Sequence, residues 1–319
     1  MRIGVILTLG LLLLNLATGS ALAQPTPPPG PATVFSSQQF DFTSAVNGKT
    51  YRITLAAPLA FPPKGGFRVI YVLDGQSYFD TFADAARFRA LNQELEPAVV
   101  VGIGYDGGLA SAQVRRNYDL TPVGPDAEQR AQDIKTHSKA EYAGAEAFFK
   151  VIETEIKPKV AKIFPVATGK EILFGHSLGG LFVLHTLFNH PEAFQTYVAL
   201  SPSIWWADRD VLKGEAGFAK RVKVGEVGPR IFIGVGGLEQ ALPKSLPPGM
   251  TMEDAKRLTI HARMVDNGKE LSARLSALTG TPGYVVQSQV FPGLTHGSVP
   301  WTALNPMLNF ALGKDRPKP

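Results

Sequence analysis

Short apolar runs rich in β-branched residues alternate along this sequence with longer stretches of helical periodicity. The runs predict strands at 51–57, 67–74, 98–105, 171–177, 196–202, 230–236 and 284–291. The stretches predict helices at 82–93, at 140–160, directly after Ser177, at 252–279 with a break near Asn267-Gly268, and at 301–313, where Pro306 is a start or a kink. This alternation predicts an α/β fold with a mostly parallel central sheet and helices on both faces.

Two long polar segments do not follow the alternation. Residues 106–136 and 205–228 are rich in glycine and in charged and polar side chains. In open α/β sheets the binding sites form at one end of the strands, in the connecting segments. We expect both segments to lie over that end.

The beginning of the chain has the layout of a secretory signal peptide. Arg2 precedes the apolar run 3–17, and small residues end the segment at Ala23. An uncleaved membrane anchor is the alternative, but the run is shorter than the roughly 20 residues that a spanning helix needs, and Asn15 interrupts it. We therefore expect residues 1–23 to be removed, no membrane span in the remaining chain, and a periplasmic or secreted protein.

The rest of the chain has the length of one domain. Residues 24–35 are proline-rich and predict an extended tether, 36–313 carry the alternating pattern, and 314–319 form a polar tail. Hydrophobic residues make up 45% of the sequence, which is sufficient for a large core. The oligomeric state is not indicated.

Composition excludes several classes of function. The sequence has no cysteine, which excludes disulfides, thiol catalysis, cysteine-ligated zinc and a lipidated cysteine. The formal net charge is +5, and loss of Arg2 with the leader leaves +4. Because the basic residues are scattered and no aromatic-interleaved basic patch occurs, the sequence argues against nucleic-acid binding.

The turn Gly175-His176-Ser177-Leu178-Gly179 is the strongest local signal. It follows a predicted strand and opens a predicted helix, which is the context of a nucleophile elbow. Such a tight turn requires small neighbours, and it forces the serine into a strained, exposed conformation. A serine in an ordinary strand-to-helix turn is the alternative, but the placement favours Ser177 as a nucleophile.

A serine nucleophile needs a base, and the base needs an acid that orients it. In this architecture the order along the chain is serine, acid, histidine. His296 lies in a glycine-rich loop after the last predicted strand, whereas His261 lies in a predicted helix. Glu239 directly follows the strand 230–236 and is the preferred acid. Asp208 or Asp210 is the alternative, and a serine–histidine pair without an acid is also open.

The oxyanion of an acyl-transfer intermediate needs two hydrogen-bond donors. The backbone N–H of Leu178, at the start of the elbow helix, supplies one. The second is expected from the loop after the strand 67–74, where the backbone N–H of Gly75 or Gln76 is available.

The motifs together resemble a branch of the α/β-hydrolases. This branch includes periplasmic and cytoplasmic esterases that open catecholate siderophore lactones, S-formylglutathione hydrolases, feruloyl esterases and mycolyltransferases. The resemblance is strongest to the siderophore-esterase-like group and covers about residues 36–313. The motifs that carry it are YVLDG, RRNYDLTP, FGHSLGGLFVLHTLF, ALSPSIWW, IGVGGLEQ and LTHGSVPW.

The resemblance implies an α/β-hydrolase fold and esterase activity. It implies Ser177 as nucleophile and His296 as base, and it places Glu239 at a position where family members vary. It also implies that the segment around Gly75 and Gln76 is the oxyanion loop.

Two further pairs are candidates for substrate binding. Arg115 and Arg116 are adjacent, so their side chains diverge and one of them is expected to face an anionic substrate; a solvated pair that anchors its loop is the alternative. Trp205 and Trp206 are candidates for an aromatic wall against a catechol or aryl ester, or else they cap the core.

The expected reaction is hydrolysis of a small-molecule carboxylic ester through an acyl-enzyme. It needs no metal and no organic cofactor. An acyltransferase, a peptidase or thioesterase, and a hydrolase-fold binding protein without turnover are the alternatives. The identity of the ester cannot be derived from the sequence.

Overall fold

The computed structural model describes residues 34–319 except 128–129, 131–140, 247–248, 281 and 315–319. The predicted leader 1–23 and most of the predicted tether 24–35 and tail 314–319 lie outside the described residues. Within the described ranges, none of the helices is both long enough and apolar enough to cross a membrane.

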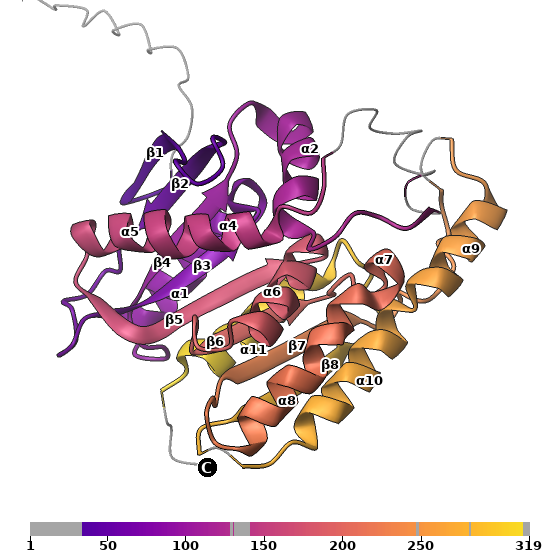
Figure 1. The fold of residues 1–319 in the computed structure, drawn as a ribbon. Coiled ribbons are helices and arrows are strands. Elements are labelled where there is room, and N and C mark those ends of the chain that lie inside the picture. Colours follow the sequence, from indigo (N-terminus) through magenta and orange to yellow (C-terminus); the bar gives the residue numbers. More distant parts are fainter. Residues whose placement is uncertain (1–33, 128–129, 131–140, 247–248, 281, 315–319) are drawn as a thin grey trace, which may run out of the picture. The chain divides into compact units, whose positions relative to one another are not determined.

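One eight-stranded sheet organises the described chain, and it confirms the predicted α/β class (Figure 1). The strand order is β1-β2-β4-β3-β5-β6-β7-β8, and only the pairs β1–β2 and β2–β4 are antiparallel. The strands are β1 (Ser37–Thr43), β2 (Thr50–Ala56), β3 (Phe67–Leu73), β4 (Ala98–Gly104), β5 (Val166–His176), β6 (Thr196–Leu200), β7 (Arg230–Gly236) and β8 (Val285–Phe291).

Helices bury both faces of the sheet. On one face, buried side chains of α1 (Gly75–Leu91) and α11 (Val299–Leu312) form one core cluster with the strands. The other face packs against the remaining large helices, which form the second core cluster. These are α2 (Gly108–Leu120), α4 (Ala145–Val151), α5 (Lys157–Ile163), α6 (Leu178–Asn189), α8 (Glu215–Lys223) and α10 (Met264–Ser276). Because β4 and β6 are buried at every residue, they read as continuous apolar runs rather than alternating ones.

Two predicted helical stretches are divided differently in the structure. The helix expected over 140–160 starts at Ala145, and a π-helical stretch (Ile152–Ile156) separates α4 from α5. The break expected near Asn267-Gly268 is wrong, since α10 runs through both residues. The break between α9 (Met252–Ala262) and α10 lies instead at Arg263, whose φ is 40°. Gly268 remains helical because it packs against Val235, where a Cβ would lie 2.7 Å from a methyl carbon.

The two polar segments contain more regular structure than expected. Residues 106–136 include α2, and 205–228 include α7 (Trp206–Arg209), a 3₁₀ turn (Asp210–Gly214) and α8. Only α2 contributes to the cavity described below, whereas α8 packs Phe218 and Val222 into the core. The edge strand β1 was not expected. Pro306 lies inside α11, which begins at Val299.

Candidate active site

Ser177 occupies the turn between β5 and α6, where the sequence pattern predicts it. Its backbone has φ 62° and ψ −118°, a conformation that L-residues rarely adopt. The Ser177 N–H donates to the carbonyl of Leu200 on the adjacent strand β6, at 3.1 Å. This geometry lifts the serine side chain out of the sheet at the carboxyl end of β5, as a nucleophile elbow requires.

Tight packing around the turn explains its glycines. A Cβ at Gly175 would lie 2.2 Å from the carbonyl oxygen of Gly179, and a Cβ at Gly180 would lie 2.9 Å from that of Leu200. Both contacts are closer than atoms tolerate, so these two positions accept no side chain. Gly179 is different, because its nearest neighbour would be Asp74 at 3.5 Å.

Two helix N-termini meet beside the serine. Leu178 is the first residue of α6, while Gly75 and Gln76 are the first two of α1. Because β3 and β5 are parallel neighbours, the helices that follow them begin side by side. The N–H groups of a first helical turn have no acceptor within their own helix, and they face outward with positive potential. The predicted donor positions are therefore brought together.

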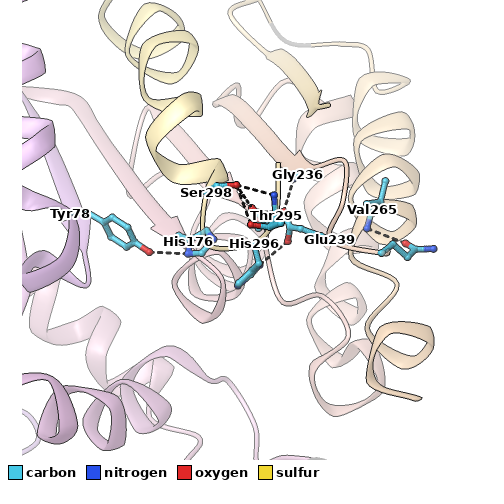
Figure 2. Close-up of polar contacts among 10 residues, drawn as sticks. Tyr78, His176, Gly236, Glu239, Val265, Thr295, His296 and Ser298 are labelled. Carbon is cyan, nitrogen blue, oxygen red and sulfur yellow. Dashed lines mark hydrogen bonds and ion pairs between the residues drawn. The ribbon is translucent and has the colours of Figure 1, made fainter. Parts of the chain in front are cut away.

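The loops after β7 and β8 bring Glu239 and His296 into contact (Figure 2). His296 Nδ1 lies 2.7 Å from Glu239 Oε2. Glu239 also accepts through Oε1 from the Ser201 hydroxyl at 2.6 Å and from the Gly236 N–H. The carboxylate is thus buried, and both of its oxygens have hydrogen-bond partners.

Backbone hydrogen bonds tie the two loops to each other. The N–H of Gly237 donates to Phe291 at 2.8 Å, and that of Leu238 donates to Leu294 at 2.9 Å. The Thr295–Ser298 turn, closed by the Thr295 N–H and the Ser298 hydroxyl at 2.9 Å, then presents His296 just before α11. The relative position of Glu239 and His296 is consequently fixed by backbone contacts.

Ser177 and His296 face one cavity of about 410 Å³ at the carboxyl end of the sheet. In the described part of the chain no hydrogen bond joins the Ser177 hydroxyl to the His296 ring. Such bonds are often long without substrate and tighten when it binds. The cavity is lined by Asp74, Gln76, Ser77, Tyr78, Ala112, Gln113, Arg116, His176, Ser177 and His296.

The sequence analysis did not anticipate a role for His176 and Tyr78. The His176 ring lies 4.5 Å from the His296 ring, and its Nδ1 lies 2.9 Å from the Tyr78 hydroxyl (Figure 2). Burial, the charge of His296 and that of Arg116 lower the pKa of His176 well below its ordinary value. Burial raises the pKa of Tyr78 to about 12, so the phenol stays protonated. His176, the residue between Gly175 and Ser177 in the elbow motif, therefore supports the ring of His296.

The two adjacent arginines diverge, as expected from their spacing. Arg116 lines the cavity and forms a two-pronged ion pair with Asp74, with both N–O distances at 2.9 Å. Burial opposes the Arg116 charge, but the Asp74 carboxylate outweighs it and raises the pKa of the guanidinium. Arg115 does not line the cavity. It donates to the carbonyl of Thr50 at 3.1 Å and lies 3.8 Å from the buried Asp119.

The adjacent tryptophans lie away from the cavity lining. Trp206 is buried and its indole N–H donates to the carbonyl of Val123 at 2.9 Å, so it caps the core. Trp205 contacts Trp206 and, edge-on, the ring of His261. Tyr78 does line the cavity, and its ring centroid lies 5.7 Å from that of the half-exposed Trp301. The aromatic wall was predicted for Trp205 and Trp206 from their position after a strand. That position does not fix where their side chains point.

The fold and the strained serine turn together define an α/β-hydrolase. Consistent with this, the family model described as "Putative esterase" matches residues 44–274. The chain belongs to this esterase family, and it is a siderophore-esterase-like α/β-hydrolase that acts on carboxylic ester bonds.

Similar proteins whose names state an activity support the same assignment. The chain is 34% identical to the ferri-bacillibactin esterase of Bacillus subtilis over 86% of this chain and 89% of that protein. It is 35% identical to a siderophore triacetylfusarinine C esterase of Aspergillus fumigatus over 79% of this chain and 84% of that one. Among solved structures, a BES protein of Bacillus cereus superposes with a TM-score of 0.75 at 32% identity, covering 90% of this chain and 99% of that one.

Proposed function

We propose that this protein is an exported serine esterase that cleaves siderophore lactone or aryl esters through an acyl-enzyme. Ser177 is the nucleophile, His296 the general base and Glu239 the orienting acid. The single observation that carries the proposal is the contact of His296 Nδ1 with the buried Glu239, with His296 facing the cavity into which the strained Ser177 also opens.

In the first half-reaction His296 acts through Nε2, since Nδ1 is engaged by Glu239. Nε2 takes the proton of the Ser177 hydroxyl as the serine oxygen attacks the ester carbonyl carbon. The imidazolium that forms is stabilised by the Glu239 carboxylate. The proton then passes to the leaving alcohol as the ester C–O bond breaks, which leaves an acyl group on Ser177.

The negative charge that develops on the carbonyl oxygen is stabilised by backbone donors. These are the N–H of Leu178 and the N–H of Gly75 or Gln76, which belong to the adjacent helix N-termini of α6 and α1. One such donor is worth about 3 kcal/mol of transition-state stabilisation.

In the second half-reaction water replaces the alcohol. His296 removes a proton from the water molecule as its oxygen attacks the acyl carbon. The bond between the acyl carbon and Ser177 Oγ then breaks, and the proton on His296 passes to Ser177 Oγ, which releases the carboxylic acid and regenerates the serine. The steps need no metal and no organic cofactor. Among the described residues there is no cluster of three or more histidine, cysteine or acidic side chains suited to a metal.

The substrate class is proposed from the cavity and the relatives. The names of the Bacillus subtilis and Aspergillus fumigatus relatives describe them as siderophore esterases. Arg116 contributes positive charge to the cavity wall. Because Arg116 is already paired with Asp74, its remaining N–H groups would orient an anionic catecholate or carboxylate rather than neutralise it. Export follows from the expected leader 1–23, with 36–313 as the esterase domain.

The proposal is tested by intact-mass spectrometry after treatment with a fluorophosphonate, with ester turnover measured in parallel. We expect one adduct on the wild type and none on Ser177→Ala, whose kcat falls by about 10³-fold or more. His261→Ala is the matched control, because His261 lies on α9 away from the cavity lining, and it should keep both the adduct and the turnover. Normal ester turnover by Ser177→Ala would refute the mechanism.

A further inference from the structure

A second cavity of about 440 Å³ lies next to the one at Ser177. It forms where β2 and β4 approach the start of α1, and the two cavities share Gln76. The proposed mechanism makes no use of it. Its lining residues are Gln39, Arg52, Thr54, Gly75, Gln76, Phe79, Asp80, Gly104 and Tyr105.

Two glycines of β4 lie beside this hollow, on the same face of the sheet. Gly102 pairs with Thr54 of β2, and Gly104 pairs with Arg52, so two cross-strand rows lack a side chain at their centre. A Cβ at Gly102 would lie 2.3 Å from the Thr54 hydroxyl, and a Cβ at Gly104 would lie 2.6 Å from Gln76 Oε1. The side chains of Thr54 and Gln76 therefore occupy the space over the glycines, and both line the hollow.

Gln76 separates the two cavities. Its side chain is exposed, and its backbone belongs to the expected oxyanion loop. A ligand that reaches the Ser177 cavity can consequently extend past Gln76 into the second cavity without crossing buried protein.

The lining suits an aryl arm that carries hydrogen-bonding groups. Phe79 supplies a buried aromatic floor on the α1 face of the sheet. Tyr105 follows β4 at the end of the cavity, and its ring packs beside Tyr51 in the core on the other face. Around the floor Gln39, Thr54 and Gln76 supply neutral polar groups. Arg52 is held by two hydrogen bonds to Asp41, at 2.9 and 2.7 Å, which offsets its charge. An apolar floor with a few polar groups at the rim is the common composition of small-molecule sites.

We propose that this second cavity is a subsite for a neighbouring arm of a multi-armed ester. The arm whose ester bond is cleaved occupies the Ser177 cavity, and the next arm lies over Phe79. This inference rests on the proposed function. A ferric ion is enclosed by several bidentate oxygen arms, so a catecholate lactone presents more arms than the one at Ser177, and those arms need a place to bind.

The test fills the second cavity from an exposed position. Gln39→Trp places an indole over the hollow. Gln38→Trp is the matched control, since Gln38 is the preceding residue on β1, is also exposed, and points to the opposite face of the sheet. Each variant is assayed on a catecholate lactone with several arms and on the methyl ester of one single arm. Thermal melts check that both variants fold.

We expect Gln39→Trp to lower kcat/KM for the lactone about tenfold, equivalent to about 1.4 kcal/mol, mainly through KM. Turnover of the single-arm ester should stay within about twofold, and Gln38→Trp should change neither substrate. Asp80→Trp, which fills the cavity from α1, should reproduce the selective loss and serves if Gln39→Trp fails to fold.

Three results would overturn the subsite. One is an equal loss on both substrates, which would indicate damage to the Ser177 cavity. Another is no loss on the lactone. The third is a wild type that does not prefer the lactone to the single-arm ester. In each case, cleavage of the single-arm ester that is abolished by Ser177→Ala leaves the esterase mechanism standing, so the two failures are distinguishable.

Discussion

Glu239 and His296 are joined by a 2.7 Å contact, yet their side chains are 1% and 45% exposed respectively. The carboxylate is enclosed by the Gly236 N–H and the Ser201 hydroxyl, while the imidazole reaches the cavity. General-base catalysis needs this arrangement, in which a buried acid is hydrogen-bonded to a base that substrate can reach. The acid loses its competing water, and the base keeps access to substrate.

Replacing Glu239 by Gln removes the charge but keeps the size of the side chain. We expect kcat for an ester to fall roughly 10³-fold, because the imidazolium loses its counter-charge and the ring its correct tautomer. Asp208→Asn is the control, since Asp208 is an exposed carboxylate outside the cavity lining and should stay within about twofold. Steady-state kinetics decides, and the reverse ranking of the two variants would identify Asp208 as the acid.

Ser201 holds the second oxygen of Glu239. Ser201→Ala removes one donor to a buried carboxylate, and such bonds are worth about 1.5–3 kcal/mol. We expect kcat to fall about tenfold or more with KM little changed, because the substrate cavity is not lined by Ser201. The split between kcat and KM is the second readout, because a role in stability alone would not lower kcat selectively. A change confined to thermal stability would assign Ser201 a structural role only.

The Arg116–Asp74 pair lies at the cavity wall with Asp74 buried. Arg116→Ala should lower the free energy of unfolding by about 3–5 kcal/mol, because it leaves a buried carboxylate without its partner. The double variant Asp74→Asn/Arg116→Gln removes both charges and should recover much of this loss. Urea denaturation measures the three proteins. A double variant no more stable than Arg116→Ala would contradict the pairing.

His176 should make stability depend on pH. Burial lowers its pKa in the folded state, so above about pH 6.5 the ring is neutral both folded and unfolded and contributes no pH dependence. Below that pH the unfolded chain takes up a proton that the folded chain does not. The free energy of unfolding should then fall by up to about 1.4 kcal/mol per pH unit, until the folded pKa is reached.

His176→Gln isolates this effect, because it removes the titrating ring and leaves the other histidines in place. Unfolding by urea at pH 7.5 and pH 5.5 should give a smaller loss of stability for His176→Gln than for the wild type. His185, whose pKa burial also lowers, contributes equally to both proteins and cancels. Parallel curves for the two proteins would show that folding does not lower the pKa of His176.

The glycines of the elbow should differ in their tolerance to alanine. Gly175→Ala places a methyl 2.2 Å from a backbone oxygen and should lower the free energy of unfolding by about 1–3 kcal/mol or more. Gly179→Ala meets only ordinary contacts at 3.5 Å and lies within α6, where alanine is the better helix former. We expect it to change stability by less than about 1 kcal/mol. Thermal melts of the two variants give the comparison, and equal losses would contradict the packing.

Much of the fold and of the site was predictable because it is local in sequence. Apolar runs bounded by turns gave the seven predicted strands, and their alternation with helices fixed the parallel architecture. The edge strand β1 has only exposed and half-buried residues, so it lacks the apolar signal that identified the others. The elbow was readable because glycine spacing, strand and helix all lie within the same stretch around Ser177.

What the tertiary structure decided was which distant side chains meet. Sequence order alone made Glu239 a candidate and kept Asp208 and Asp210 open, whereas the pairing of the loops after β7 and β8 brings Glu239 to His296. Side-chain direction likewise separates Arg116, which lines the cavity, from Arg115, which does not.

The same limit applies to the tryptophans, to His176 and to the second cavity. Trp205 and Trp206 follow a strand that ends at the site, but their directions depend on packing against Val123 and His261. The second cavity depends on how β2 and β4 meet the start of α1. Periodicity and spacing are properties of the chain and were fixed by the sequence itself. Contacts between loops depend on how the strands are ordered in the sheet, and only the folded structure determines them.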